Sequence, residues 1–169
     1  MTLYAPESLV VMGVAGCGKS TLAAAVAERI GWALVEGDHF HSESSRLKMA
    51  QGIALNDDDR TSWLASLCAQ LQQHPGGVVV ACSALKRSYR EQLRRASPGL
   101  RFAFLHIDKR EACRRVLTRG AHFFAASLVD SQFETLEPPA GEPGVLQLNA
   151  LRPLGELQAD VCHWLGATS

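Results

Sequence analysis

The sequence predicts an α/β fold in three layers, with an open, mostly parallel sheet covered by helices on both faces. Short apolar runs alternate with longer amphipathic segments along the 169 residues, which is the pattern of repeated strand–helix–strand units. Several runs are β-branched and uninterrupted, as parallel strands buried on both faces require. The length suits one domain with its own core, so we expect a single domain spanning 1–169.

The first predicted unit is a strand, a glycine-rich loop, a helix and a second strand. The apolar run at 9–12 stops at Gly13, and the Ala-rich segment 21–30 has the composition of a helix. Gly31 follows that helix as a typical C-cap residue, and the next apolar run covers 32–35. The two strands are therefore expected to be parallel, as in a strand–helix–strand unit.

A polar stretch over 36–60 follows the second strand. It contains a predicted short helix over 46–51, and three aspartates at 57–59 suit the positive N-terminus of a helix that begins near Arg60. That helix carries one apolar stripe, made of Trp63, Leu64, Leu67 and Leu71.

The second half of the chain continues the same alternation. The expected elements are a fully buried central strand over 78–82, a helix over 86–95, a strand over 100–107, a helix over 110–119, a strand over 145–148 and a helix from 153 to 165. Between the last two strands, Ser127-x-x-Asp130 resembles a capping box, which predicts a helix that begins at Ser127. The Pro-Pro pair after Glu137 ends that helix.

Charge and cysteine content exclude several classes of protein. Seventeen Lys and Arg balance seventeen Asp and Glu, so the protein has no net positive charge that would attract nucleic acid or an anionic membrane. Residues 86–119 nevertheless hold eleven basic and three acidic side chains, which could serve a small polyanion or form solvated helix faces. For Arg87, Arg90, Arg94 and Arg95 we favour the solvated face. Five scattered cysteines and the absence of a leader or a long apolar run predict a cytoplasmic protein.

Residues 13–20 match the phosphate-loop pattern G-x-x-x-x-G-K-[ST], between an apolar strand and a helix as that motif requires. The glycines let backbone N–H groups surround phosphate oxygens, Lys19 reaches the β- and γ-phosphates, and Ser20 can ligate Mg²⁺. A fortuitous Gly-rich turn is the weaker alternative. The fold is therefore of the P-loop NTPase type, with ATP and Mg²⁺ as cofactors. Predicted nucleotide contacts are Gly13, Val14, Ala15, Gly16, Cys17, Gly18, Lys19, Ser20 and Thr21.

Asp38 is the acidic residue best placed for chemistry. It follows the second strand, where the sheet topology brings it close to the phosphate loop. There a carboxylate can orient a substrate hydroxyl or accept its proton. A regulatory GTPase is not supported, because the nearest string to its guanine-reading motif, at 56–59, lacks the lysine. A motor-type ATPase is not supported either, because the strand over 78–82 ends in Ser83 rather than an acid.

Further motifs resemble the gluconate kinases of the small P-loop kinase group, and together they run over most of the chain. These motifs are Gly37-Asp38-x-x-His41, Lys48-Met49, Leu55-Asn56-Asp57-Asp58-Asp59-Arg60, Trp63-Leu64, Cys82-Ser83-Ala84-Leu85-Lys86-x-x-Tyr89-Arg90, His122-Phe123-Phe124 and Ser131-Gln132-Phe133-Glu134-Thr135-Leu136-Glu137. The resemblance implies transfer of phosphate from Mg²⁺-bound ATP to the 6-hydroxyl of D-gluconate. It also implies a homodimer.

The resemblance assigns roles to individual residues. Asp38 and His41 would face the sugar acid, and Arg60 and Lys86 would hold it. A small lid over about 115–127 would cover ATP, with Arg115 near the adenine and Arg119 at the phosphates. The catalytic set is then Lys19, Asp38 and Arg119.

Chemistry agrees with this substrate class, because gluconate offers one carboxylate and five hydroxyls. Arg60, Lys86, His41 and Ser83 supply the cations and hydrogen-bonding groups that such a ligand needs. His122 either binds sugar, orders the lid or packs in the interior. Ser42 and Ser45 stand where relatives usually carry Pro and Asn. The alternatives are a kinase for another small polyol acid such as shikimate, and a binding module that ATP merely switches.

Overall fold

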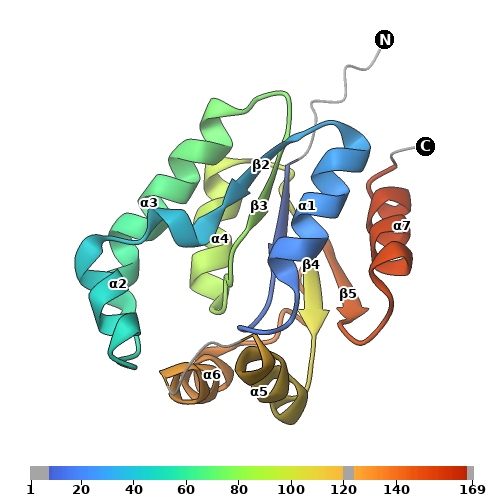
Figure 1. Cartoon of the computed structure of the whole chain (residues 1–169). Coiled ribbons are helices and arrows are strands. Elements are labelled where there is room, and N and C mark those ends of the chain that lie inside the picture. The colour runs from blue at the N-terminus through green and yellow to red at the C-terminus, as the bar shows by residue number, and fades with distance from the viewer. Residues whose placement is uncertain (1–7, 120–123, 167–169) are drawn as a thin grey trace.

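A five-stranded parallel sheet in the order β2-β3-β1-β4-β5 forms the centre of the computed structural model, which describes residues 8–119 and 124–166 (Figure 1). The strands are β1 (Leu9–Met12), β2 (Ala33–Glu36), β3 (Val78–Ala81), β4 (Arg101–His106) and β5 (Val145–Asn149). Each pair of neighbours in this order is parallel. The predicted parallel sheet is confirmed, and β3 is fully buried as expected, although β1 occupies the middle position.

Helices cover both faces of the sheet, with α1 and α7 on one face and α3 and α4 on the other (Figure 1). The helices are α1 (Lys19–Ile30), η1 (Gly37–Phe40), α2 (Glu43–Ala50), α3 (Asp57–Gln73), α4 (Arg87–Ala96), α5 (Lys109–Thr118), α6 (Phe124–Thr135) and α7 (Leu154–Trp164). Helices α5 and α6 lie beyond the carboxyl end of β4. No helix among the described residues combines the length and apolar character that crossing a bilayer demands.

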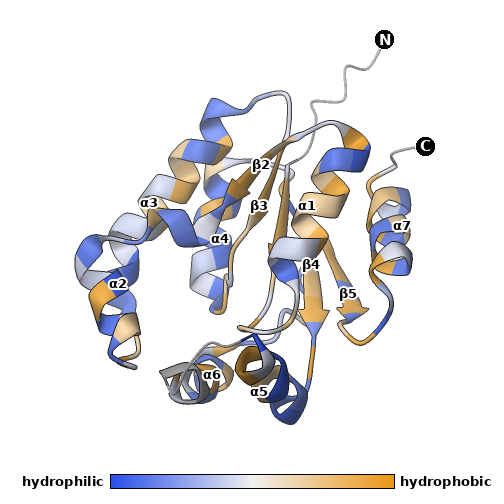
Figure 2. Cartoon of the chain, in the orientation of Figure 1, coloured by the Kyte–Doolittle hydropathy of each residue, from blue (hydrophilic) through white to orange (hydrophobic). Residues whose placement is uncertain are grey.

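Alternate residues of the strands point into two separate hydrophobic cores. In β1, Leu9 and Val11 contact the core under α1 and α7, whereas Val10 and Met12 contact the core under α3 and α4. All four side chains are fully buried, which explains why the strand is apolar at every position rather than at every second one. The strands accordingly form the most hydrophobic layer of the molecule (Figure 2).

The start of α3 lies three residues before the predicted position. The side chain of Asn56 accepts a hydrogen bond from the backbone N–H of Asp59, and the Asp59 carboxylate accepts one from the N–H of Asn56. This reciprocal pair is a capping box, so the aspartates belong to the first turn of the helix rather than preceding it. The predicted stripe from Trp63 to Leu71 is buried, as expected.

The prediction that a helix begins at Ser127 is wrong. Helix α6 begins at Phe124, so Ser127 and Asp130 lie within it. Asp130 forms an ion pair with Lys109 of α5 at 2.7 Å, and the hydroxyl of Ser127 donates to the Gly52 carbonyl at 3.3 Å. The Ser-x-x-Asp spacing therefore serves contacts to neighbouring elements, because residues three apart also share one face of a helix.

A single-turn helix that the sequence analysis did not anticipate, η1, follows β2 and carries Asp38. Its first residue, Gly37, lies against the end of β3, where a Cβ atom would come within 2.5 Å of the Ala81 carbonyl oxygen. Trp63 of α3 donates its indole N–H to the Gly37 carbonyl at 2.8 Å. Glycine is therefore required for this close approach, which places Asp38 at the carboxyl edge of the sheet.

Arg90 is fully buried, so the prediction of a solvated face is wrong for this residue. Its guanidinium donates to the Glu142 carboxylate at 2.6 and 3.0 Å and to the carbonyls of Ala84, Leu85 and Glu137. Arg94 also pairs with Glu142, at 3.0 Å. These contacts hold the loop after β3, in which Ala84 adopts a left-handed backbone with φ 46°.

Replacing Glu142 by Gln should cost about 3–5 kcal/mol of unfolding free energy, because it leaves the buried Arg90 charge uncompensated. Burial raises the pKa of Glu142, but hydrogen bonds from Arg90 and Arg94 outweigh it and bring the pKa below the ordinary 4.5. The ionised pair thus stabilises the fold above pH 4.5 and loses its effect as the pH falls through the lowered pKa.

Urea unfolding at pH 7 and at pH 3 measures this loss. Glu156→Gln is the matched control, since Glu156 is 59% exposed and pairs only loosely with Arg152 at 3.7 Å. Equal losses in the two variants at pH 7 would contradict the buried-pair account.

Candidate active site

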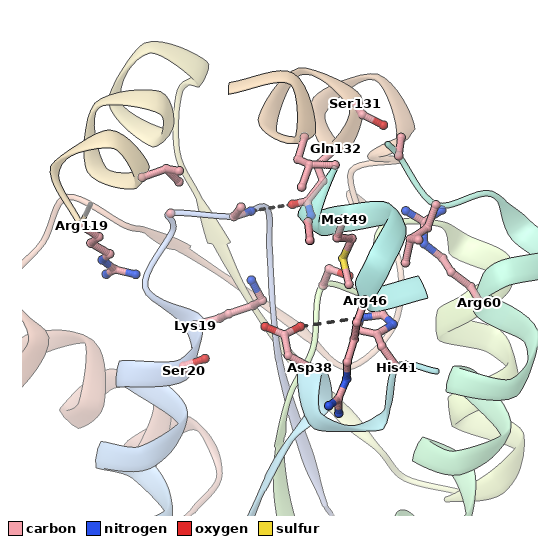
Figure 3. A pocket seen from close by; sticks show the side chains of 18 of the residues that line it. Lys19, Ser20, Asp38, His41, Arg46, Met49, Arg60, Arg119, Ser131 and Gln132 are labelled. Atoms are coloured by element: carbon pink, nitrogen blue, oxygen red, sulfur yellow. Dashed lines mark hydrogen bonds and ion pairs between the residues drawn. The ribbon is translucent and has the colours of Figure 1, made fainter. Parts of the chain in front are cut away.

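A pocket of about 570 Å³ opens at the carboxyl ends of the strands, between the phosphate loop and the segments η1, α2 and α6 (Figure 3). Its size is typical of a small-molecule site. The position is also the expected one, because the strand order reverses at β1: β2 and β3 lie on one side of it, and β4 and β5 lie on the other. The lining residues are Ala15, Gly16, Gly18, Lys19, Ser20, Thr21, Asp38, His41, Arg46, Met49, Ala50, Ala54, Leu55, Arg60, Ser83, Val116, Arg119, Leu128, Ser131 and Gln132.

The phosphate loop connects β1 to α1 and forms one wall of the pocket. Gly16 and Gly18 have φ of 84° and 92°, and a Cβ atom on Gly16 would come within 2.7 Å of the Ala112 carbonyl. Only glycine fits both requirements. Six of the nine predicted nucleotide contacts line the pocket, whereas Gly13, Val14 and Cys17 are buried in the loop. The loop also ends at the N-terminus of α1, a site that favours anions.

Asp38 and His41 lie together on the opposite wall (Figure 3). Nε2 of His41 is 3.8 Å from the Asp38 carboxylate, and the imidazole stacks on Trp63 with 4.9 Å between ring centroids. Burial lowers the pKa of His41 from its ordinary 6.5, although the Asp38 charge opposes that shift. Nδ1 of His41 is buried and has no partner among the described residues. The lowered pKa favours the neutral ring at pH 7.

The two predicted substrate cations are placed differently. Arg60 lines the pocket and donates to the Tyr89 hydroxyl at 3.3 Å. Lys86 is not among the lining residues, because its ammonium donates to the Asp57 carboxylate at 2.9 Å. Tyr89 donates to the same carboxylate. Hydrogen bonds from Lys86 and Tyr89 accordingly lower the pKa of Asp57.

The two lid arginines also differ. Arg119 lines the pocket on the phosphate-loop side (Figure 3), and its role at the phosphates stays a prediction. Arg115 does not line it: its guanidinium donates to the Ala150 carbonyl at 3.0 Å and pairs with Glu111 at 3.2 Å. Ser83, predicted to bind substrate, lines the pocket, and His122 falls outside the described residues.

Comparisons with known proteins are consistent with this site. Residues 9–139 match a family model described as an AAA domain. A gluconokinase from Gluconobacter oxydans is 45% identical over 162 residues, which cover 92% of this chain and 86% of that protein. The chain belongs to the gluconokinase family.

Two further gluconokinases support that membership. The thermoresistant gluconokinase of Escherichia coli is 42% identical over 149 residues, covering 86% of this chain and 85% of that protein. The crystal structure of a gluconokinase from Sinorhizobium meliloti superimposes with a TM-score of 0.88 at 44% identity, covering 95% of this chain and 92% of the other. The P-loop fold and the family assigned from the motifs are both confirmed.

The gluconokinase-type site also contains residues that sequence reasoning missed. Glu36 accepts a hydrogen bond from the Ser20 hydroxyl at 3.0 Å, and Gln132 accepts one from the Ala15 N–H at 2.6 Å. Arg46 lines the pocket and donates to the His39 carbonyl at 2.7 Å. Glu36 could have been found, because it ends the second strand at the edge that carries Asp38. Gln132 belongs to one of the motifs that carry the resemblance, but its contact could not have been predicted, since no local pattern connects it with the phosphate loop.

The environment of His41 predicts a pH-dependent signal from Trp63. Protonated imidazole in contact with an indole should quench its fluorescence, with a midpoint below pH 6.5 because burial lowers the pKa of His41. The same shift means that protonation opposes folding, so stability should fall as the pH drops below 6.5. A pH titration of tryptophan fluorescence is measured for the protein and for the His41→Gln variant. The difference between the two isolates the signal of Trp63 from that of the other tryptophans. A midpoint at or above 6.5, or an unchanged titration in His41→Gln, would contradict it.

Proposed function

We propose that this protein transfers the γ-phosphoryl group of ATP to the 6-hydroxyl of D-gluconate, giving 6-phospho-D-gluconate and ADP. The observation that carries the proposal is that one pocket joins the phosphate loop to Asp38, His41 and Arg60. Nucleotide phosphates and a polyhydroxy acid can therefore meet in one enclosed space. Membership of the gluconokinase family supports this choice of acceptor.

The phosphoryl donor is held by the wall built from residues 13–20. Backbone N–H groups of the loop and the N-terminus of α1 favour the phosphates, and Lys19 contributes a full positive charge. Arg119 adds a second cation on the same side of the pocket. Together these groups stabilise the negative charge that spreads over the transferred phosphoryl group.

The acceptor is held by the opposite wall. The Asp38 carboxylate is 70% exposed and its ion pair with His41 is long, at 3.8 Å, so it is available to orient the 6-hydroxyl and accept its proton. The guanidinium of Arg60 has the planar donor geometry that a carboxylate requires, and Ser83 and His41 offer hydrogen bonds to hydroxyls. We assign the gluconate carboxylate to Arg60 rather than Lys86, because Asp57 already neutralises Lys86.

Magnesium belongs to this proposal because the donor set fits it. The Ser20 hydroxyl and the Glu36 carboxylate are hard oxygen ligands in direct contact at the mouth of the phosphate loop. When bound, the ion would neutralise charge on the β- and γ-phosphates. Ser20 and Glu36 are therefore the residues that would hold it, directly or through water.

Four further features remain part of the proposal. They are the single domain over 1–169, the lid over about 115–127 with Arg115 near adenine, the homodimer, and the cytoplasmic location. The resemblance to gluconate kinases supports the lid and the homodimer. Arg115 already contacts the phosphate loop from outside the pocket, with Nη1 3.4 Å from the Gly16 carbonyl.

Release of ADP from Mg²⁺-ATP should be stimulated by gluconate, and not by shikimate, other aldonates or nucleoside monophosphates. Asp38→Asn should lower kcat with gluconate by about 10²–10⁴-fold while leaving ATP affinity nearly unchanged, because Asp38 acts on the acceptor. Stimulation by another acid would support kinase activity but would show that the acceptor is not gluconate. Slow hydrolysis that no acceptor stimulates would instead favour a nucleotide-switched binding module.

Glu36→Gln should raise the Mg²⁺ concentration for half-maximal activity by about tenfold or more, because it removes a charged oxygen beside the metal. The matched control is Glu43→Gln, since Glu43 is an exposed acid in the first turn of α2 and outside the pocket lining. A Mg²⁺ titration of ADP release measures both variants. If the Mg²⁺ concentration for half-maximal activity is the same in the protein and in Glu36→Gln, Glu36 does not help to bind the metal.

A further inference from the structure

A side chain of helix α6 makes a hydrogen bond to the phosphate loop. The carboxamide oxygen of Gln132 accepts a hydrogen bond from the backbone N–H of Ala15 at 2.6 Å, between residues 117 positions apart in the chain (Figure 3). Ala15 and Gln132 both line the pocket. The contact is therefore made inside the site, at the wall that holds the phosphates.

The position of Gln132 is fixed by its own helix. Val129, one turn earlier on the same face, is fully buried, and Phe133 and Leu136 pack against the same core. The ion pair between Asp130 and Lys109 fastens α6 to α5 on its outer side. These contacts hold Gln132 in place before any ligand binds, so the side chain is pre-organised for binding.

Chemistry determines which end of the Gln132 carboxamide faces the pocket. A backbone N–H can only donate, so the oxygen must be the end that meets Ala15. The amino group then points away from that N–H, and it has no protein partner among the described residues. The amino group therefore presents two N–H donors to the pocket. They lie next to the phosphate loop, whose other backbone N–H groups are suited to donate to phosphate oxygens.

We propose that Gln132 is a further nucleotide-binding residue, whose amino group donates to the γ-phosphoryl group of ATP while its oxygen fixes the phosphate loop at Ala15. The proposal rests on the phosphoryl transfer proposed above. It explains why a neutral amide is suited to this position. A carboxylate would accept equally well from Ala15 but would place a negative charge beside the phosphate.

Gln132→Glu separates the two ends of this side chain. The variant keeps an acceptor for the Ala15 N–H, so the fold and the loop should be preserved, but it replaces the donor by a negative charge. We expect binding of a non-hydrolysable ATP analogue to weaken about tenfold or more relative to binding of ADP, which lacks the γ-phosphoryl group. We also expect kcat to fall by roughly 100-fold.

Calorimetric titration of Mg²⁺-ADP and of the Mg²⁺-bound ATP analogue measures the ratio of the two affinities. Glu134→Gln is the matched control on α6, because Glu134 is exposed and lies outside the pocket lining. That variant should leave the ratio unchanged. Gln132→Met removes both ends of the amide and should also shift the ratio toward ADP, by a few-fold.

An unchanged ratio in folded Gln132→Glu would overturn the proposal, because a purely structural contact at Ala15 survives that substitution. Should Gln132→Glu not fold, an unchanged ratio in Gln132→Met would overturn it equally. Nucleotide binding is measured without any acceptor, so this outcome is independent of the acceptor panel. A protein that ignores gluconate yet shows the shifted ratio would contradict the proposed function alone.

Discussion

The parallel pairing of β1 with β3 on one side and β4 on the other is the constraint on which the site depends. Because every strand runs in the same direction, the segments that follow β1, β2 and β3 all emerge at one edge of the sheet. Those segments carry the phosphate loop, Asp38 and Ser83. Donor and acceptor groups from three distant parts of the sequence therefore meet without any of them needing a long loop of its own.

The sequence was most informative where local chemistry decides the structure. The glycines of residues 13–20 permit backbone conformations that other residues avoid, so their spacing before Lys19 and Ser20 identifies the phosphate loop. Uninterrupted β-branched runs predict buried parallel strands, and the stripe of Trp63 and Leu67 predicts the buried face of α3. Asp38 was located by topology, because the residue after the second strand must lie at the carboxyl edge.

What the sequence could not supply was the partner of each charged or polar side chain. Arg90 is one of several arginines on a basic helix, and only the fold shows that Glu142 neutralises it in the interior. Lys86 follows a buried strand, where a substrate-binding cation is expected, yet its ammonium pairs with the Asp57 carboxylate. The capping box predicted at Ser127 was wrong for the same reason. Two polar residues three positions apart can cap the start of a helix, but they can also lie on one face within it.

The connection from α6 to β5 has the composition of an ordinary surface loop, with three prolines, two glycines and an alanine between Glu137 and β5. It nevertheless has two contacts with the segment after β3: the N–H of Glu137 donates to the Leu85 carbonyl at 2.8 Å, and Glu142 binds Arg90 of α4. Surface loops generally tolerate insertions. An insertion between Glu137 and Glu142 would have to keep both contacts, so this connection should tolerate a change of length less well than an ordinary loop.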